Sequence, residues 1–338
     1  MTKRERIIAA LSHKETDFIP TQVDFTAQEY ERVAEYLGDP SFWNQVDNHI
    51  SGAYYAGYPE EIEGRPGFFK DDFGVVWNRT GADRDIGVTE GKRIEDLETE
   101  SITLGEPPIA RIRENYEYLM SAKGDTFTFG QIGFSMFERA WSLCSMEDVL
   151  MGMVLFPDAI HKLLDEICEY NMKIIDVALE YDIDGFHFGD DWGQQKGLIM
   201  GAEHWRTFIK PRMKKMYSKV KAAGKFVSQH SCGDIEEIFD DLIEIGLDCY
   251  QTFQPEIYDI QKVKDTYGDK LSFWGGISTQ QLLPFATPEK VASETRRIMN
   301  IMGKNGGYIL APTHSVPGDV PPENIVAMLD AFKNQSAK

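Results

Sequence analysis

The sequence predicts an α/β protein, a single (β/α)₈ TIM barrel with an irregular N-terminal extension. From residue 125 onward, short apolar runs rich in β-forming residues alternate with helix patterns, as expected for parallel strands joined by crossover helices. An early strand and at least one more before residue 120 bring the count to eight, which favours a barrel over an open doubly wound sheet. The chain also lacks the GxGxxG and GxxxxGK[ST] motifs of nucleotide-binding open sheets.

The first 120 residues or so are the irregular part, rich in Gly, Pro and aromatic residues. The opening MTKRERIIAALSHKETD has the spacing of an amphipathic helix, but neither the apolar core nor the cleavage site of a signal peptide. We expect a strand over residues 18–25 (FIPTQVDF). Residues 69–77 (FKDDFGVVW) are expected to form a hairpin or a loop facing the substrate.

Residues 121–335 are the regular part. Strands are expected to start near residues 125, 184, 225, 248, 271 and 307, and apolar residues at i, i+3 and i+4 predict helices between them, for example over 160–181, 235–246 and 288–303. The sequence shows no linker, internal repeat or low-complexity stretch. It therefore predicts one domain over residues 1–338.

The composition narrows the class of partner. The chain has 55 acidic and 35 basic residues, a net charge of −20, so nucleic acid, an anionic membrane or a polyanion held by surface charge is not expected. No apolar run reaches the roughly 18 residues that suggest a membrane span, and the four cysteines are too few for a disulfide framework. A cytoplasmic protein acting on a small molecule is the expectation.

The carboxyl ends of the predicted strands carry the polar residues, where the active site of such a barrel forms. In the strand ending at His230, residues i and i+2 lie on one face about 6.6 Å apart, so His230 and Cys232 can both reach one Zn²⁺. His314, after the last strand, is the best-placed third ligand, with Glu256 as the alternative. Three ligands leave a fourth position open, as in catalytic zinc sites.

Other residues at the same strand ends are candidates for substrate contacts. Asp190 and Asp191, and His314 with them, could orient the substrate or transfer a proton, although either aspartate could equally cap a helix or support a ligating histidine. The expected substrate-binding residues are polar or aromatic: Asp24, Gln131, Trp192, Gln194, Gln251, Phe253 and Trp274.

Several segments resemble the uroporphyrinogen decarboxylase superfamily: HSCGDIEEIFDDLIEIGLD, LSFWGGIS, GGYILAPTHSVPGDVPPENI, the opening MTKRERIIAALSHKETDFIP and the loop DDFGVVW. The resemblance implies a (β/α)₈ barrel. Within the superfamily the chain is more similar to the cobalamin-dependent methyltransferases. The decarboxylases have an Arg-rich segment after the first strand that binds the carboxylates of the porphyrinogen, whereas residues 21–33 here contain Asp24 and no Arg before Arg32.

The resemblance also implies cofactors and a direction of reaction. Family members that methylate a thiol bind zinc through His-x-Cys and a second Cys in the segment where this chain has His314. One thiolate and two imidazoles leave the site at about +1, which makes the zinc a stronger Lewis acid. We therefore expect O-demethylation: zinc activates the leaving oxygen of a small methylated substrate, such as a methoxylated aromatic, while a corrinoid takes the methyl group.

The cobalamin is expected on a separate corrinoid protein, because the chain has no DxHxxG motif of its own. A homodimer is compatible with this reading. The alternatives are a cofactor-free decarboxylase like uroporphyrinogen decarboxylase, methyl transfer from a methylcorrinoid to a thiol, and a non-catalytic protein that binds a corrinoid partner.

Overall fold

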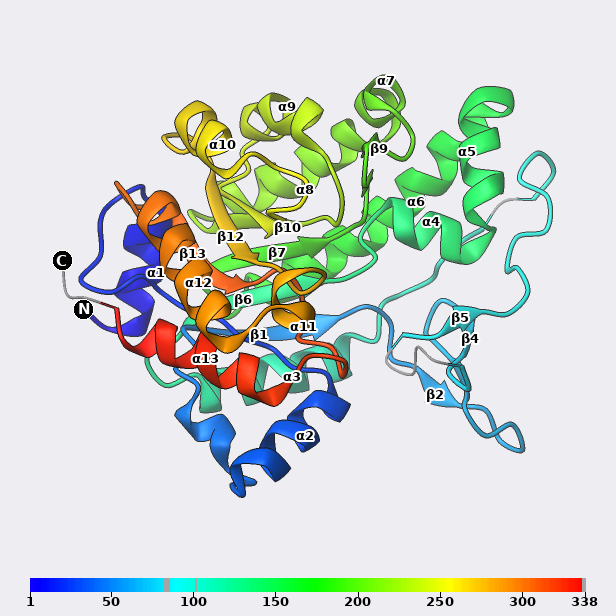
Figure 1. Ribbon diagram of the computed structural model, residues 1–338. Coiled ribbons are helices and arrows are strands. Elements are labelled where there is room, and N and C mark those ends of the chain that lie inside the picture. Colours follow the sequence, from blue (N-terminus) through cyan, green and yellow to red (C-terminus); the bar gives the residue numbers. More distant parts are fainter. Residues whose placement is uncertain (82–85, 101, 336–338) are drawn as a thin grey trace.

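The structure is a computed structural model that describes residues 1–81, 86–100 and 102–335. Its central sheet has seven parallel strands in the order β1-β6-β7-β10-β11-β12-β13. These are β1 (Ile50–Tyr55), β6 (Phe127–Ile132), β7 (Gly185–Gly189), β10 (Phe226–His230), β11 (Cys249–Phe253), β12 (Ser272–Ile277) and β13 (Tyr308–Pro312). The sheet curves and helices pack around its outside (Figure 1). This α/β fold is compatible with a TIM barrel.

The helices that cover the sheet come largely from the crossover connections. They are α1 (Lys3–Leu11), α2 (Ala27–Leu37), α3 (Ile109–Ala122), α4 (Phe137–Leu143), α5 (Met146–Leu155), α6 (Pro157–Ala178), α7 (Ala202–His204), α8 (Lys210–Ala222), α9 (Phe239–Glu244), α10 (Ile260–Tyr267), α11 (Leu282–Phe285), α12 (Pro288–Met302) and α13 (Pro322–Lys333). Short 3₁₀ or π turns occupy Phe42–Gln45, Trp205–Ile209 and Glu236–Ile238. None of the helices described here has the length and apolar character needed to cross a membrane.

The alternation expected from residue 125 onward is confirmed: each of the six expected runs contains one strand of the central sheet, namely β6, β7, β10, β11, β12 and β13. The helix expected over 160–181 is α6, whose periodic apolar side chains are buried. The expectation over 235–246 corresponds to a 3₁₀ turn followed by α9, and that over 288–303 to α12.

The strand expected over 18–25 is not confirmed as a strand of the sheet. Thr21 and Phe25 make only isolated parallel bridges, to Leu310 and Val316 on the β13 side. On the β1 side there is one backbone hydrogen bond, from the His49 N–H to the Thr21 carbonyl, and beyond it side-chain amides replace the ladder: Gln22 Oε1 accepts from the Ile50 N–H, and the Val23 N–H donates to the side chain of Asn48. The segment therefore lies between β13 and β1 without continuous backbone pairing.

The helix α1 closes the end of the sheet opposite the carboxyl ends of the strands (Figure 1). Its Ile7 and Leu11 are buried with Ile50, Phe127 and Phe129 in a second apolar cluster that extends to Trp274. This cluster fills the interior of the curved sheet. The Trp274 ring, nearer the carboxyl ends of the strands, packs against this cluster.

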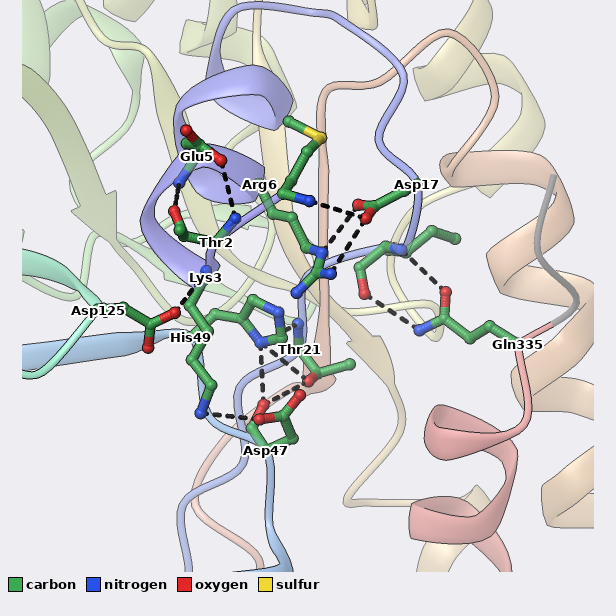
Figure 2. Close-up of polar contacts among 12 residues, drawn as sticks. Thr2, Lys3, Glu5, Arg6, Asp17, Thr21, Asp47, His49, Asp125 and Gln335 are labelled. Carbon is green, nitrogen blue, oxygen red and sulfur yellow. Dashed lines mark hydrogen bonds and ion pairs between the residues drawn. The ribbon is translucent and has the colours of Figure 1, made fainter.

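Polar contacts hold α1 in place (Figure 2). Thr2 and Glu5 form a capping box at its start. Arg6 donates two hydrogen bonds to Asp17, and Lys3 pairs with Asp47. Asp17 lies in the segment after α1 and Asp47 in the segment before β1. These contacts therefore attach α1 to two other parts of the chain.

The hairpin expected over 69–77 is present as β3 (Phe68–Lys70) and β4 (Val76–Asn78). With β2 (Glu60–Glu61) and β5 (Val88–Thr89) these strands make a small antiparallel sheet near the carboxyl ends of the central strands (Figure 1). Buried Asp71 organises the turn, accepting from the Phe73 and Val75 N–H groups and the Trp77 indole. It also pairs with buried Arg139 of α4, which fixes the hairpin beside the barrel.

Candidate active site

The carboxyl ends of the central strands surround a cavity of about 360 Å³. Its lining includes seven residues that the sequence singled out: Asp24, Gln131, Asp191, His230, Gln251, Trp274 and His314. They come from the segment before β1 and from β6, β7, β10, β11, β12 and β13 or the loops after them. Residues distant in the chain are therefore brought together in the arrangement expected of a barrel active site.

His230 and His314, which line this cavity, form a possible metal site together with Cys232. One ligand atom of each lies within 4.8 Å of the others, and the Cys232 Sγ is 3.6 Å from the His230 Nε2. Zinc bonds of about 2.0–2.1 Å to nitrogen and 2.3 Å to sulfur, at tetrahedral angles, place two such donor atoms about 3.6 Å apart. The donor set and the spacing of this His230–Cys232 pair therefore fit Zn²⁺.

The ring of His230 is oriented by its neighbours. Its Nδ1 lies within hydrogen-bond distance of the Gln251 Oε1 in the adjacent strand. Since a carbonyl oxygen only accepts, Nδ1 carries the proton and Nε2 is free to bind a metal. The Asp191 carboxylate lies 3.3 Å from that Nε2 and accepts from the Cys232 N–H at 2.7 Å.

The charges around His230 favour a cation at this position. Burial lowers the pKa of His230, but Cys232 and Asp191 outweigh it and the pKa is raised well above its ordinary value. Burial likewise raises the pKa of Asp191, and hydrogen bonding to His230 reverses this and lowers it to about 2. An environment that holds a proton on His230 so strongly also suits a divalent metal in the proton's place.

The loop that carries Cys232 is held by buried hydrogen bonds. The Tyr250 and Tyr258 hydroxyls donate to the carbonyls of Ser231 and Gly233, at 2.9 and 2.8 Å. Gly233 has φ +77°, and a Cβ there would lie 2.2 Å from the backbone of Gly193. Only glycine permits this conformation and close approach without strain, so the loop presents Cys232 in a fixed position.

Asp190 and Asp191 have different environments. Asp190 is fully buried and accepts from the Met136, Phe137 and Glu138 N–H groups at the start of α4. Burial raises its pKa to about 6, with these bonds opposing the shift, so the carboxylate is ionised at neutral pH. The sequence allowed either aspartate to act on the substrate, to cap a helix or to support a ligating histidine. In the structure Asp190 caps α4, and Asp191 lies beside the possible metal ligands.

Comparison with known proteins identifies the family. A family model described as uroporphyrinogen decarboxylase (URO-D) matches residues 88–335. The chain belongs to the URO-D family. The uroporphyrinogen decarboxylases of Chloroherpeton thalassium and Chlorobaculum tepidum are each 24% identical over 186 residues, covering 54% of this chain and 50% and 51% of the relative. The chain thus spans about half the length of the curated relatives it matches.

A solved structure extends the similarity of fold over nearly the whole chain. A methyltransferase from Methanosarcina mazei matches with a TM-score of 0.73 over 98% of both chains, at 18% identity. At this identity the match shows a shared fold. The possible metal ligands lie within the part of the chain that the URO-D model covers.

Six residues singled out in the sequence of this URO-D family member are not part of the cavity lining: Asp190 and Cys232, whose contacts are given above, and four others. Trp192 is buried edge-on against Trp205, and Phe253 stacks on Tyr258. Gln194 is exposed in the short ribbon formed by β8 (Gly193–Gln194) and β9 (Gly197–Leu198). Glu256 lines a separate cavity beside α11 and is absent from the cluster of possible ligands in the described residues.

Glu138 and Tyr54 are among the cavity residues that sequence reasoning missed, and it left the role of His187 open. Glu138, in the first turn of α4, and Tyr54 of β1 both line the cavity. Burial and then the nearby Asp191 raise the pKa of Glu138 well above its ordinary value. The signal available in the sequence was the single carboxylate of Glu138, soon after the strand expected near residue 125. His187, which the sequence allowed as a core or a site residue, lies in the lining and contacts Ser228 at 3.0 Å.

Proposed function

We propose that this protein is a zinc-dependent methyltransferase that moves a methyl group from a methoxylated aromatic substrate to a corrinoid protein. The observation that carries the proposal is the convergence of His230, Cys232 and His314, two of which, His230 and His314, line the cavity. These three residues would hold Zn²⁺ and leave a position open for substrate. Bound there, the metal supplies Lewis acidity for a departing oxygen.

The surrounding residues have supporting roles in this proposal. Gln251 keeps the His230 Nε2 available, and Asp191 holds the Cys232 backbone. Trp274 is 6% exposed and offers an aromatic wall at the cavity. Two neutral imidazoles and one thiolate give a more positive metal than two thiolates would, which favours demethylation of an ether over methylation of a thiol.

The proposal extends to the whole molecule. The chain would be one (β/α)₈ domain with residues 18–25 in the eighth strand position, acting in the cytoplasm as a homodimer. The four cysteines are unpaired in the structure, as a reducing compartment requires. The partner would be a separate corrinoid protein.

A cofactor-free decarboxylase is the second candidate, favoured by the names of the sequence relatives. A porphyrinogen carries many carboxylates and requires cations in the cavity. Among the described residues that line it, none is Lys or Arg. This lining therefore favours the methyltransferase.

Elemental analysis of the purified protein and of His230→Ala, Cys232→Ala and His314→Ala tests the proposal. We expect about one zinc per chain, lost in the first two variants and weakened in the third. Zinc retained at full affinity in His314→Ala would assign that residue to the substrate and return Glu256 as a ligand. No zinc after reconstitution under reducing conditions would reject the mechanism in favour of the decarboxylase.

A further inference from the structure

Two polar side chains of the cavity lining stand beside the possible metal ligands without belonging to them. Gln131 of β6 and His187 of β7 both line the cavity. They are register partners in the parallel pairing of the two strands, and side chains of register partners lie on the same face of a sheet, with the strands about 4.8 Å apart. The amide and the imidazole therefore form a neighbouring pair in one wall.

Only one ring nitrogen of His187 has a partner in the protein. Its Nδ1 lies 3.0 Å from the hydroxyl of Ser228, the register partner in β10. The ring is otherwise flanked by aromatic groups, with centroids 5.9 Å away for Phe129 and 5.5 Å away for Trp274. Nε2 has no hydrogen-bond partner among the described residues. Since polar atoms in such surroundings are normally paired, Nε2 is left for a ligand in the cavity.

The Gln131 amide is the second group without a protein partner, again within the described part of the chain. It occupies the space above Gly52, where a Cβ would come within 2.5 Å of the amide nitrogen. The amide offers both a donor and an acceptor. A ligand hydroxyl also donates and accepts, so it can pair with Gln131 and with the His187 Nε2 in either tautomer of the ring.

This pair lies close to the possible metal site. The ring centroids of His187 and His230 are 6.5 Å apart, and those of His230 and His314 are 5.9 Å apart. One small molecule can therefore hold an ether oxygen at the metal position and a hydroxyl at His187. The shortest link between two such oxygens in an aromatic ring is a pair of neighbouring ring carbons.

We propose that His187 is a substrate-binding residue that, together with Gln131, hydrogen-bonds a hydroxyl group next to the methoxy group of the methyl donor. The proposal rests on the proposed function and narrows its substrate class. A donor with its hydroxyl elsewhere would bury Nε2 without a partner, which weakens binding on the order of 10–100-fold.

Two positional isomers of equal size and charge test this: 2-methoxyphenol and 4-methoxyphenol. Binding to the zinc-loaded protein is measured by isothermal titration calorimetry, and demethylation is measured separately with free cob(I)alamin as acceptor. We expect 2-methoxyphenol to bind about 10–100-fold more tightly. His187→Leu should abolish most of this preference with zinc still bound, and His187→Gln, which keeps a polar group, should retain part of it. His161→Leu on α6, outside the cavity lining, is the matched control and should keep the wild-type ratio.

Three results would overturn the role of His187. The first is equal binding of the two isomers by the wild-type protein. The second is a preference that survives at full size in zinc-loaded His187→Leu, because the metal itself would then hold the hydroxyl. The third is loss of zinc in His187→Gln, which would place the ring in the metal site. If His187→Leu does not fold, the wild-type ratio and His187→Gln still decide the question.

The demethylation assay separates this proposal from the proposed function. Equal binding and equal demethylation of the two isomers would reject the role of His187 and leave the methyltransferase intact. A binding preference for 2-methoxyphenol that depends on His187, without demethylation of either isomer, would support the hydroxyl site and count against the proposed function. Absence of binding by both isomers would reject the hydroxyl site.

Discussion

At the residue scale, the metal-binding capacity of His230 depends on Gln251, whose amide oxygen faces Nδ1 and leaves Nε2 directed at Cys232. Removing such a partner typically weakens a metal site about 10–100-fold. We expect this loss of zinc affinity in Gln251→Leu, measured by competition with a chelator. Gln251→Glu keeps an acceptor and should restore most of it. Gln261→Leu, at an exposed position of α10, is the matched control, and equal zinc affinity in all three variants would contradict the role of Gln251.

The raised pKa of His230 gives the metal-free protein a specific pH dependence. A histidine whose folded pKa lies above its unfolded value of 6.5 stabilises the fold fully below that pH, and the contribution is lost as the pH rises through the folded pKa. The pKa values of His13, His49, His187 and His314 are instead lowered. These histidines therefore change the free energy of unfolding mainly below pH 6.5, not above it.

Urea unfolding of the zinc-free protein should therefore show a falling free energy of unfolding as the pH rises above 6.5. His230→Gln should lack that part of the decline. The pKa values of Glu29 and Glu138 are raised as well, to about 7 for Glu29. Since both carboxyls remain in the variant, the difference between the two proteins isolates His230. Parallel curves would show that His230 is not held protonated.

At the scale of elements, helix α4 starts where it does because Asp190 accepts from three consecutive backbone N–H groups. In Asp190→Asn one oxygen becomes a donor and the charge is lost, so we expect a cost of about 2–4 kcal/mol in the free energy of unfolding. The measurement is urea unfolding of the metal-free protein. Asp191→Asn is the paired control, which should lower zinc affinity more than stability. A cost below about 0.5 kcal/mol for Asp190→Asn would reject the cap.

Helix α1 stabilises the barrel from its other end. Ile7 is completely buried in the interior cluster, and truncation of a buried isoleucine leaves a cavity that costs about 2–5 kcal/mol. Ile7→Ala should lower the free energy of unfolding by this amount in chemical denaturation. Val154→Ala on α5, 66% exposed, should stay within about 0.5 kcal/mol. Similar values for the two variants would mean that α1 is only loosely attached.

Local patterns were sufficient to predict most strands of the central sheet, because each is a short apolar run between helix patterns. They also predicted the cluster of His230, Cys232 and His314, since the carboxyl ends of parallel strands meet. The strand over 18–25 failed for a tertiary reason, the side-chain amides that replace its pairing with β1.

The cavity walls required information that the sequence does not contain locally. Two-residue spacing would place Phe253 on the same face as Gln251, but the register shifts between them and Phe253 packs on Tyr258 instead. Glu138 reaches the cavity only because Asp190, about fifty residues later in the chain, fixes the start of α4. Tyr54 depends on the register of β1 against β6, where it faces Gln131.

At the scale of the whole molecule, the proposed zinc would join parts of the barrel that are not adjacent. His230 is the last residue of β10 and Cys232 follows it, whereas His314 follows β13, and two strands lie between β10 and β13 in the sheet. A metal that binds only the folded protein stabilises it by RT ln(1 + [L]/Kd), about 4 kcal/mol at a thousandfold excess over Kd. We expect chelation to lower the thermal midpoint, and zinc to restore it, in the wild-type protein.

The same titration in variants distinguishes a joint role from two separate ones. If all three residues bind one ion, His314→Ala and Cys232→Ala should each abolish most of the zinc-dependent shift, and the double variant should lose no more than the larger single loss. Additive losses would indicate independent binding sites. A zinc-dependent shift that survives in His314→Ala at full size would show that the metal does not connect β13 to β10, and the open coordination position would then have to be completed by a residue outside this cluster.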